Sequence, residues 1–370
     1  MKIAVLTSSR ADFGIYLPLL KLLKKDKYFL LEIISFGTHL SKDHGYTYKE
    51  IDQEGFSLIH KIDTLPNGDS PKDISACIGN TVAKFAKFWN SNSYDLVFCL
   101  GDRYEMFAAV SAGLSFNQSF AHIHAGETTL GAIDNSFRHS ISLFSDILFV
   151  TTEEYKKRAI NIAGNDKDVY NVGALSIDNL CGIPLLTKDE FFSKFGIDMN
   201  LPTILSTFHP ETINFKKNIF YIDELLSVFS DLLDTHQIII TLPNNDTMGN
   251  EVRKKIKKFK KENDSLIVVE SFGVEGYLSC MKHSLFLLGN TSSGFVEASF
   301  FSKPVINLGD RQKGRIVTKN IINTNILKDE IIKSIEKINS LDLSNNNMFY
   351  GDGKSAEKII KIIKEKYGNK

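Results

Sequence analysis

The feature that most constrains the fold is a repeated alternation between short apolar runs and segments with helical periodicity. Residues 2–9 (KIAVLTSS) form an apolar run closed by a polar turn, and residues 16–26 (YLPLLKLLKKD) then place apolar side chains at helical spacing. Further runs of the same kind are FLLEIISFGTHL, DLVFCLGDR, QSFAHIHAGE and DILFVTTEE. Such alternation is typical of a parallel sheet covered by helices on both faces. We therefore expect an α/β fold.

The alternation restarts in the second half of the chain. Residues 202–211 (PTILSTFHPE) and 236–246 (HQIIITLPNND) each have the pattern of a strand followed by a loop. Because 370 residues are many for a single core, we expect two Rossmann-like domains with parallel sheets. The predicted domains are residues 1–180 and 181–353, with an amphipathic helix at 354–370 that could pack back on the first domain.

Charge and cysteine content argue against several protein classes. Lysine plus arginine equals aspartate plus glutamate at 44 each, so no bulk electrostatic attraction to nucleic acid or an anionic membrane is expected. The four cysteines form no C-x-x-C pair, which indicates neither a disulfide framework nor a zinc site. The N-terminal apolar run is too short for a signal peptide, and no run approaches the length of a membrane span. We expect a cytosolic protein.

Polar residues follow the predicted strands at their carboxyl ends. In open α/β sheets, ligands bind outside these ends. Two such edges facing each other would form an interdomain cleft, where we expect the active site. The residues in these positions are Arg10, His39, Asp102, His124, His209, Asn245 and Ser292.

Two strand-to-helix turns of the first half carry charged residues with two open interpretations each. Arg10 lies in SSRADFG, where a helix N-terminus and a guanidinium could bind phosphate, or where the arginine could simply close a helix cap at the surface. Asp102 lies in CLGDRYE, directly after an apolar run. It is either an ordinary helix N-cap or a catalytic carboxylate.

Residues 121–139 (AHIHAGETTLGAIDNSFRH) hold the densest group of titratable side chains. Gly126 permits a sharp turn, and Glu127 follows it directly. A helix beginning near Asp134 would place Asp134 and Arg138 on one face, where an i,i+4 salt bridge alone could explain them.

The histidines of the same stretch raise the question of a metal. His122 and His124 would share one face of a strand, but the sequence offers no clear third ligand. No metal site is therefore predicted.

In the second half, His209 in FHPET could donate to a phosphate or protonate a leaving oxygen, or be an ordinary loop histidine. The segment GNTSSGFVEAS places Ser292 and Ser293 at the predicted start of a helix, where N–H and hydroxyl groups could bind a pyrophosphate. Glu297 would then lie where a carboxylate can hold ribose hydroxyls, or would simply complement the helix dipole. The spacing matches neither the Walker motif nor G-x-G-x-x-G.

The ordered set of motifs resembles the hydrolysing UDP-N-acetylglucosamine 2-epimerases of sialic- and legionaminic-type acid biosynthesis. The resemblance covers nearly the whole chain, through TSSRADFG, LGDRYE, HIHAGETTLGAIDNSFRHSI, FHPET, LPNNDTMG, GNTSSGFVEAS and NLGDRQKGR. It implies a GT-B-like pair of Rossmann domains, no cofactor and no required metal, and a homodimer or homotetramer. The implied reaction eliminates UDP to give a 2-acetamidoglycal and then adds water with inversion at carbon 2, producing UDP and N-acetylmannosamine.

The resemblance also implies roles for individual residues. The implied catalytic positions are Asp102, His124, Glu127, Asp134 and His209. The positions implied to hold UDP are Arg10, Arg138, Asn245, Ser292, Ser293, Glu297 and Arg315. Two departures stand out, because many relatives carry glutamate where this chain has His124 and glycine where it has Ala125.

Other functions remain open at this stage. The same reaction on UDP-2,4-diacetamido-2,4,6-trideoxyglucose is one alternative, and a non-hydrolysing epimerase that keeps UDP attached is a second. A GT-B glycosyltransferase would need an acceptor. A sugar-nucleotide sensor without activity would not need the cluster of acids.

Overall fold

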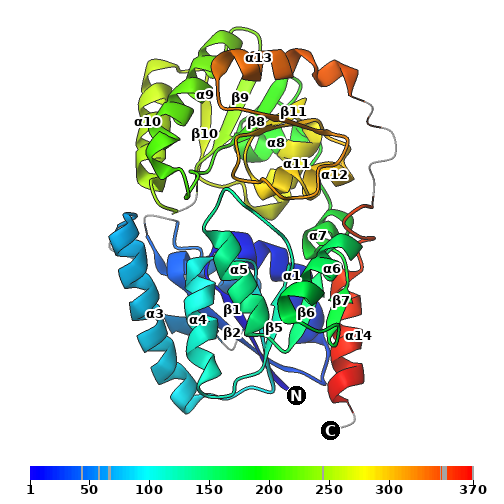
Figure 1. Ribbon diagram of the computed structural model, residues 1–370. Coiled ribbons are helices and arrows are strands. Elements are labelled where there is room, and N and C mark those ends of the chain that lie inside the picture. The colour runs from blue at the N-terminus through cyan, green and yellow to red at the C-terminus, as the bar shows by residue number, and fades with distance from the viewer. Residues whose placement is uncertain are drawn as a thin grey trace. The chain divides into compact units, whose positions relative to one another are not determined.

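The computed structural model describes residues 1–42, 45–56, 59–65, 68–243, 246–341, 343 and 348–368 (Figure 1). The chain divides into two compact units. The first unit consists of Met1–Glu127, Asp134–Gly182 and Tyr350–Lys370, and the second of Thr128–Ile133 and Ile183–Phe349.

The first unit contains a seven-stranded sheet with the order β3-β2-β1-β4-β5-β6-β7, and all of its strand pairs are parallel. Its strands are β1 (Lys2–Thr7), β2 (Leu30–Phe36), β3 (Ile59–Ile62), β4 (Leu96–Leu100), β5 (Phe120–Ile123), β6 (Ile147–Val150) and β7 (Val169–Asn171). Its helices are α1 (Arg10–Lys25), α2 (Tyr48–Gln53), α3 (Pro71–Ser91), α4 (Tyr104–Leu114), α5 (Asp134–Leu143), α6 (Glu153–Ala163), α7 (Leu175–Gly182) and α14 (Ser355–Tyr367).

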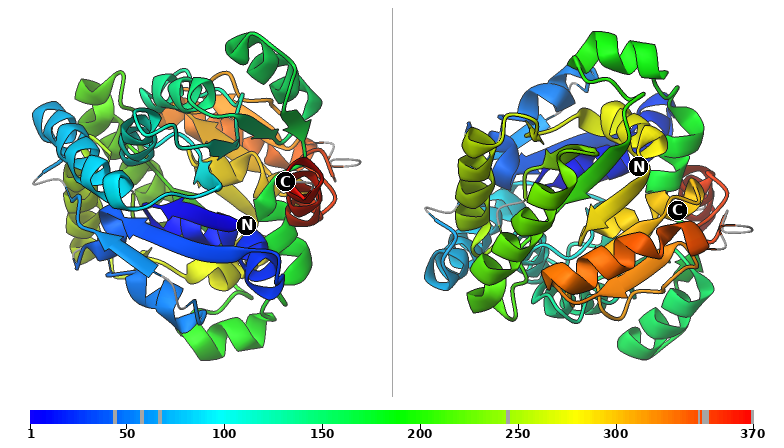
Figure 2. Two further views of the ribbon diagram at one scale, coloured as in Figure 1. Left: turned by 90° about the horizontal axis from the view of Figure 1, so that it is seen from below. Right: turned by 90° about the horizontal axis from the view of Figure 1, so that it is seen from above.

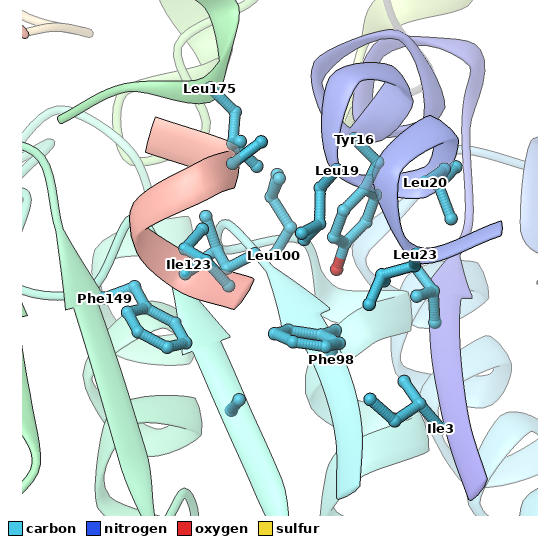
Figure 3. Packing of buried hydrophobic residues seen from close by; sticks show 14 of the residues in the cluster. Ile3, Tyr16, Leu19, Leu20, Leu23, Phe98, Leu100, Ile123, Phe149 and Leu175 are labelled. Carbon is cyan, nitrogen blue, oxygen red and sulfur yellow. The ribbon is translucent and has the colours of Figure 1, made fainter. Parts of the chain in front are cut away.

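Apolar side chains cover both faces of this sheet. Because successive strand residues point to opposite faces, β1 contributes Ile3 and Val5 to one buried cluster and Ala4 and Leu6 to the other. Figure 3 shows the first cluster, in which strand residues such as Phe98 pack against side chains of α1. Helix α14, drawn red in Figures 1 and 2, packs against α1 and α7.

The second unit repeats this design with a six-stranded parallel sheet of order β10-β9-β8-β11-β12-β13. Its strands are β8 (Thr203–Thr207), β9 (Gln237–Thr241), β10 (Ile267–Val269), β11 (Phe286–Gly289), β12 (Val305–Leu308) and β13 (Ile321–Thr324). Its helices are α8 (Lys188–Phe195), α9 (Asn218–Leu232), α10 (Gly249–Glu262), α11 (Gly273–His283), α12 (Glu297–Phe300) and α13 (Lys328–Glu336). Buried clusters again lie on both faces. Two parallel sheets covered by helices confirm the predicted α/β fold class.

The strand order reverses once in each sheet, and such a switch point is where ligands bind in open α/β folds. In the first unit the reversal lies between β1 and β4, which lead into Arg10 and Asp102. In the second it lies between β8 and β11, which lead into His209 and Ser292. Both sheets therefore present predicted site residues at their switch points.

One predicted helix is much shorter than expected. The serine pair opens a 3₁₀ turn, η3 (Ser292–Gly294), and α12 then spans only Glu297–Phe300. The helix cannot continue because Ser302 has a positive φ of 48° and Lys303 precedes a proline, which disfavours the helical conformation. Within the described residues, no helix has the length and apolar character needed to cross a membrane.

Candidate active site

The turn after β1 is held by a capping box. Ser9 is the N-cap of α1, its hydroxyl accepts from the backbone N–H of Asp12, and the Asp12 carboxylate accepts from the backbone N–H of Ser9 at 2.9 Å. Arg10 is therefore the first residue of α1, directly after the N-cap residue Ser9. The cap itself is closed by Ser9 and Asp12, so the alternative that Arg10 closes it is wrong.

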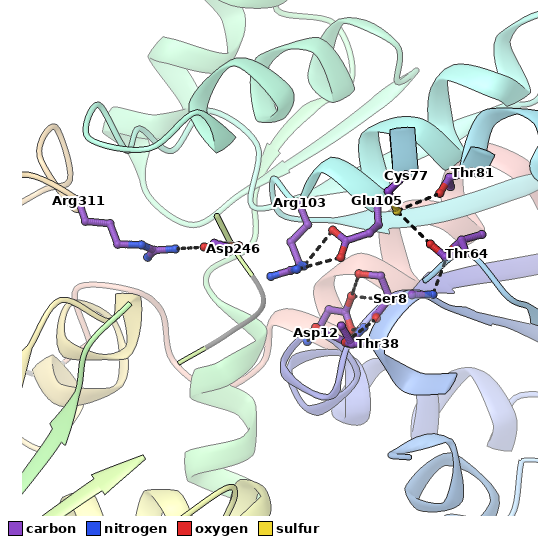
Figure 4. A network of polar contacts seen from close by, with 12 residues as sticks. Ser8, Asp12, Thr38, Thr64, Cys77, Thr81, Arg103, Glu105, Asp246 and Arg311 are labelled. Atoms are coloured by element: carbon purple, nitrogen blue, oxygen red, sulfur yellow. Dashed lines mark hydrogen bonds and ion pairs between the residues drawn. The ribbon is translucent and has the colours of Figure 1, made fainter. Parts of the chain in front are cut away.

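Asp12 is also the centre of a buried network that the sequence analysis did not single out. Its carboxylate accepts from the Ser8 hydroxyl at 2.9 Å (Figure 4). It also accepts from the Thr7 hydroxyl at 2.7 Å. His39 reaches the same group, with Nε2 3.8 Å from Asp12 Oδ1. Burial raises the pKa of Asp12, but hydrogen bonding and charge interaction with His39, aided by the bonds from Ser8 and Thr7, outweigh it and lower the pKa overall. An ionised Asp12 thus fixes the turn that presents Arg10.

Asp102 is an ion-pair partner and not a helix cap. The N-cap of α4 is Arg103, and it makes no side-chain capping bond. Arg103 instead pairs with the buried Glu105 at 2.9 Å (Figure 4). Asp102 pairs with Arg138, whose side chain is almost fully buried on α5. The carboxyl end of β4 is in this way connected to the helix that follows β5.

His122 is a structural residue at the end of β5. Its Nε2 lies 2.7 Å from the carbonyl oxygen of Gly101, and its Nδ1 lies 2.9 Å from the hydroxyl of Ser142. Burial, opposed by the bond to Gly101 and reinforced by the charge of Arg138, lowers its pKa to about 3, so the ring is neutral. Both ring nitrogens are engaged, which leaves none for a metal.

His124 does not share a strand face with His122, contrary to prediction. Strand β5 ends at Ile123, and His124 adopts a left-handed backbone with a φ of 66°. Histidine tolerates this conformation better than branched residues do. Gly126 has a φ of 74°, and a Cβ there would lie 2.3 Å from the carbonyl oxygen of Tyr155. Ala125, by contrast, has no positive φ and is buried, so alanine fits at this position.

The tight turn brings His124 and Glu127 together with Arg138. His124 Nδ1 lies 3.1 Å from Glu127 Oε1, and Arg138 Nη1 lies 3.7 Å from Glu127 Oε2. The same Nη1 donates to the carbonyl oxygen of His124 at 3.0 Å. Together with Asp102, these residues form one cluster of two carboxylates, a guanidinium and an imidazole. Proton transfer and stabilisation of developing charge are the chemistry that such a set can supply.

The segment Thr128–Ile133 leaves the first unit and packs in the second. Leu130 N donates to the carbonyl oxygen of Lys313 at 2.8 Å, and Ile133 N donates to the Thr212 hydroxyl at 2.8 Å. A Cβ on Gly131 would lie 2.1 Å from the carbonyl oxygen of Asp310, so this approach requires glycine. Glu127 and Asp134 flank the segment, and Asp134 is buried in the first turn of α5.

In the second unit, the backbone of His209 is held by an asparagine. His209 N donates to Asn290 Oδ1 at 2.7 Å, and Asn290 Nδ2 donates to the His209 carbonyl oxygen at 2.8 Å. Asn290 is fully buried and directly follows β11. Its role was not predicted, because it depends on the pairing of β11 with β8.

The serine turn also has a partner that the sequence did not reveal. The Ser293 hydroxyl lies 2.6 Å from the Tyr277 hydroxyl and 3.2 Å from that of Thr291. Burial raises the pKa of Tyr277 to about 12, so its hydroxyl is protonated and available as a donor. Ser292 is exposed, and Glu297 begins the short α12.

Arg315 lies at the end of a glycine-containing loop after β12. Its Nε donates to Gln312 Oε1 at 2.6 Å, and Gln312 Nε2 donates to the Asn290 carbonyl oxygen at 2.8 Å. Nearby in sequence, Arg311 forms an ion pair with Asp246 at 3.1 Å (Figure 4). The remaining predicted site residue, Asn245, lies outside the described residues.

The predicted residues thus gather into two sets. The first unit brings Asp102, His124, Glu127 and Arg138 together. The second links His209 to Arg315 through Asn290 and Gln312, and it pairs Ser293 with Tyr277. Over the described part of the chain, no group of three histidine, cysteine or acidic side chains has the arrangement of a metal site. The residues of the first unit can supply acid–base chemistry, and the hydroxyl, imidazole and guanidinium groups of the second can donate hydrogen bonds to an anion.

Comparison with known proteins connects this geometry to a family. The family model described as UDP-N-acetylglucosamine 2-epimerase matches residues 21–364. The chain belongs to this family. It is similar to the polysialic acid biosynthesis protein P7 of Escherichia coli, with 35% identity over 369 residues that cover 98% of this chain and 94% of the relative.

Two further similarities bear on this 2-epimerase family member. The hydrolysing GDP/UDP-N,N′-diacetylbacillosamine 2-epimerase of Campylobacter jejuni is 35% identical over 346 residues, which cover 93% of this chain and 89% of that protein. The crystal structure of the Methanocaldococcus jannaschii UDP-GlcNAc 2-epimerase in complex with UDP-GlcNAc and UDP has a TM-score of 0.82 at 18% identity, covering 99% of this chain and 100% of that one. The predicted family and the GT-B-like fold are confirmed.

Proposed function

We propose that this protein is a hydrolysing 2-epimerase that converts a UDP-2-acetamido sugar into UDP and a free sugar of mannose configuration. In the first step the proton on carbon 2 is removed and the bond from carbon 1 to the UDP oxygen breaks, which leaves a 2-acetamidoglycal. In the second step water adds its hydroxyl to carbon 1 and a proton to carbon 2 from the opposite face. One water is consumed, and no oxidant is needed.

The observation that carries the proposal is the charged cluster at the carboxyl ends of β4 and β5 in a chain of this family. Abstraction of a carbon-bound proton needs a positioned base, and rehydration needs a group that returns a proton. Asp102, Glu127 and Asp134 are the carboxylates proposed for these steps. We assign His124 to the same acid–base group, because it contacts Glu127 directly.

Departure of UDP requires groups that stabilise negative charge. Guanidinium groups bind phosphate oxygens bidentately, and hydroxyl and imidazole groups donate single hydrogen bonds. In the proposal, His209 assists the leaving phosphate oxygen and Glu297 accepts from ribose hydroxyls. The remaining proposed UDP ligands are Arg10, Arg138, Asn245, Ser292, Ser293 and Arg315.

We propose UDP-N-acetylglucosamine as the substrate, with N-acetylmannosamine as the product. The relation to a protein named for polysialic acid biosynthesis supports this choice. A specific observation favours a second candidate, UDP-2,4-diacetamido-2,4,6-trideoxyglucose, since a relative of equal identity is named as a diacetylbacillosamine 2-epimerase. The two substrates differ at carbons 4 and 6 and leave the chemistry at carbons 1 and 2 unchanged. We further propose that the enzyme acts in the cytosol as a homodimer or homotetramer.

A direct comparison of the two UDP-sugars tests the proposal. Purified protein is incubated with each sugar and no acceptor, and UDP release and the configuration of the free sugar are measured. The expected result is stoichiometric UDP and mannose-configured sugar, with a larger kcat/KM for UDP-N-acetylglucosamine. A larger kcat/KM for the diacetamido sugar would select the second candidate. An epimerised sugar still attached to UDP would indicate a non-hydrolysing enzyme, and no UDP release from either sugar would refute the proposal.

A further inference from the structure

Two buried amide side chains connect the groups that we propose to hold UDP in the second unit. The first is Asn290, whose side chain binds both the backbone N–H and the backbone carbonyl of His209, at 2.7 and 2.8 Å. Asn290 directly follows Gly289, which pairs with Thr207 of β8, and His209 lies two residues beyond Thr207. A Cβ on Gly289 would lie 2.0 Å from the carbonyl oxygen of Thr207. The pairing of β11 with β8 thus places Asn290 beside the segment that carries His209.

The second amide is Gln312, which is 2% exposed. Its Nε2 donates to the backbone carbonyl of Asn290 at 2.8 Å, and its Oε1 accepts from Arg315 Nε at 2.6 Å. Only one orientation of the amide satisfies both partners, since the reverse orientation would set oxygen against oxygen and N–H against N–H. This hydrogen bond uses Nε of Arg315 and so fixes the direction in which the two terminal nitrogens of the guanidinium group point.

Asn290 is the junction of the network. Its side chain forms hydrogen bonds with the backbone of His209, and its backbone carbonyl accepts one from Gln312. Two residues further along the chain, the Ser292–Ser293 turn begins. Three elements that are separate in sequence therefore share one hydrogen-bonded centre.

We propose that Asn290 and Gln312 are positioning residues, which preorganise His209, the serine turn and Arg315 for the diphosphate of UDP. The inference rests on the proposed function, because it takes these three elements to be UDP ligands. Donors that are already aligned with a phosphate bind it without the cost of ordering them at the moment of binding. Neither amide needs to touch the ligand for this effect.

A purely structural role makes a different prediction. Any buried amide must satisfy its polar atoms, and losing one lowers stability wherever it lies in the unit. A positioning role in addition weakens the binding of UDP. A matched control is Gln237, at the amino end of β9, whose Nε2 donates to the Asp198 carbonyl oxygen at 3.0 Å and to the Thr203 hydroxyl at 2.9 Å. It belongs to the same sheet but lies at the opposite end of the strands from His209.

The test compares Gln312→Met with Gln237→Met in the full-length protein. The dissociation constant of UDP is measured by titration calorimetry, the kinetic constants with the preferred UDP-sugar, and the melting temperature by calorimetry. For Gln312→Met we expect UDP binding about tenfold weaker and KM about tenfold higher with kcat within about twofold, since the lost interaction is present in both the ground state and the transition state. For Gln237→Met we expect a lower melting temperature and unchanged UDP affinity.

A second variant, Gln312→Glu, keeps the inference testable if Gln312→Met does not fold. It keeps the size and the bond to Arg315, but it places a carboxylate oxygen against the Asn290 carbonyl, and we expect it to weaken UDP binding at least as much. Wild-type UDP affinity and KM in both Gln312 variants would overturn the inference. So would failure of both variants to fold while Gln237→Met folds, because the amide would then be a folding determinant. A wild-type protein that neither binds UDP nor releases it from a UDP-sugar would instead refute the proposed function itself.

Discussion

Nδ1 of His124 lies 3.1 Å from Oε1 of Glu127, and the Thr151 hydroxyl donates to the same carboxylate oxygen at 3.3 Å. A carboxylate oxygen accepts hydrogen bonds, so in this contact Nδ1 of His124 is the donor. Nε2 of His124 is buried and has no hydrogen-bond partner among the residues that the structure describes. Glu127 thus orients the ring through Nδ1, and Nε2 is the nitrogen to which the proposed function assigns proton transfer.

If His124 and Glu127 act as a unit, the losses of activity caused by their separate substitutions should not add in the double variant. We expect His124→Gln and Glu127→Gln each to lower kcat by about 100-fold, the usual scale of a lost general acid or base, and the double variant to lose little more than either one. Steady-state kinetics of the wild type, both single variants and the double variant measures the coupling. Losses that multiply in the double variant would show that the two residues work independently.

Asp102 should be required for activity through its charge. In Asp102→Asn the ion pair with Arg138 is lost, and the buried guanidinium keeps only its longer contact with Glu127 at 3.7 Å. We expect kcat/KM to fall at least about 100-fold, on the scale of a lost catalytic carboxylate. The matched control is Asp146→Asn at the amino end of β6, where the carboxylate accepts from Phe120 N at 3.3 Å. Full activity of Asp102→Asn, in a folded protein, would show that the assignment of this acid is wrong.

The turn that positions His124 should not tolerate a side chain at Gly126. Gly126→Ala is compared with Gly164→Ala, because the two glycines have φ values of 74° and 73° but only Gly126 has a neighbour within 4 Å of the added Cβ. We expect Gly164→Ala to cost about 1–2 kcal/mol for the backbone conformation alone. Gly126→Ala adds a collision with the Tyr155 carbonyl and should cost roughly 4 kcal/mol or more. Equal urea midpoints for the two variants would contradict the close approach of α6 to this turn.

His122 should make the protein sensitive to acid. Its pKa is about 3 in the folded state, whereas an unfolded histidine has a pKa near ~6.5. Below pH ~6.5 the unfolded chain therefore binds a proton that the folded protein does not, and stability falls as the pH drops towards 3. The contribution amounts to about 2 kcal/mol between pH ~6.5 and ~5.

The comparison with His122→Gln isolates this contribution. Glutamine can still donate to the Gly101 carbonyl but does not titrate. Urea unfolding at both pH values should show a smaller loss of stability in the variant than in the wild type. The same loss in both proteins would exclude His122 as the source.

The sequence predicted most of the individual strands, because the buried strands are continuous apolar runs with polar turns at their carboxyl ends. It did not predict β3, β7 or β13. Strands β3 (IHKI) and β13 (IINT) are mixed in polarity, and β7 has three residues, so none of them stands out from a loop. Helix α3 was also absent from the prediction, although Ser70, Pro71 and Asp73 form the capping box and N1 proline that mark its start.

The sequence predicted those residues of the candidate site whose type alone indicates their chemistry. Asp102 and Glu127 are charged residues in turns that follow strands, Arg138 lies within the helix α5, and the three do come together. Asn290, Gln312 and Tyr277 were missed, because the role of an amide or phenol is set by the groups that it contacts in the folded chain. For Asn290 those contacts depend on the register of β8 with β11, which no local pattern encodes.

The most direct test of the proposed reaction is proton NMR of the UDP-sugar conversion in D₂O. The account predicts that UDP and a free mannose-configured 2-acetamido sugar form together, and that carbon 2 of the sugar carries deuterium, because its original proton is removed and replaced from solvent. A free sugar that retains glucose configuration and its original proton at carbon 2 would contradict elimination and rehydration.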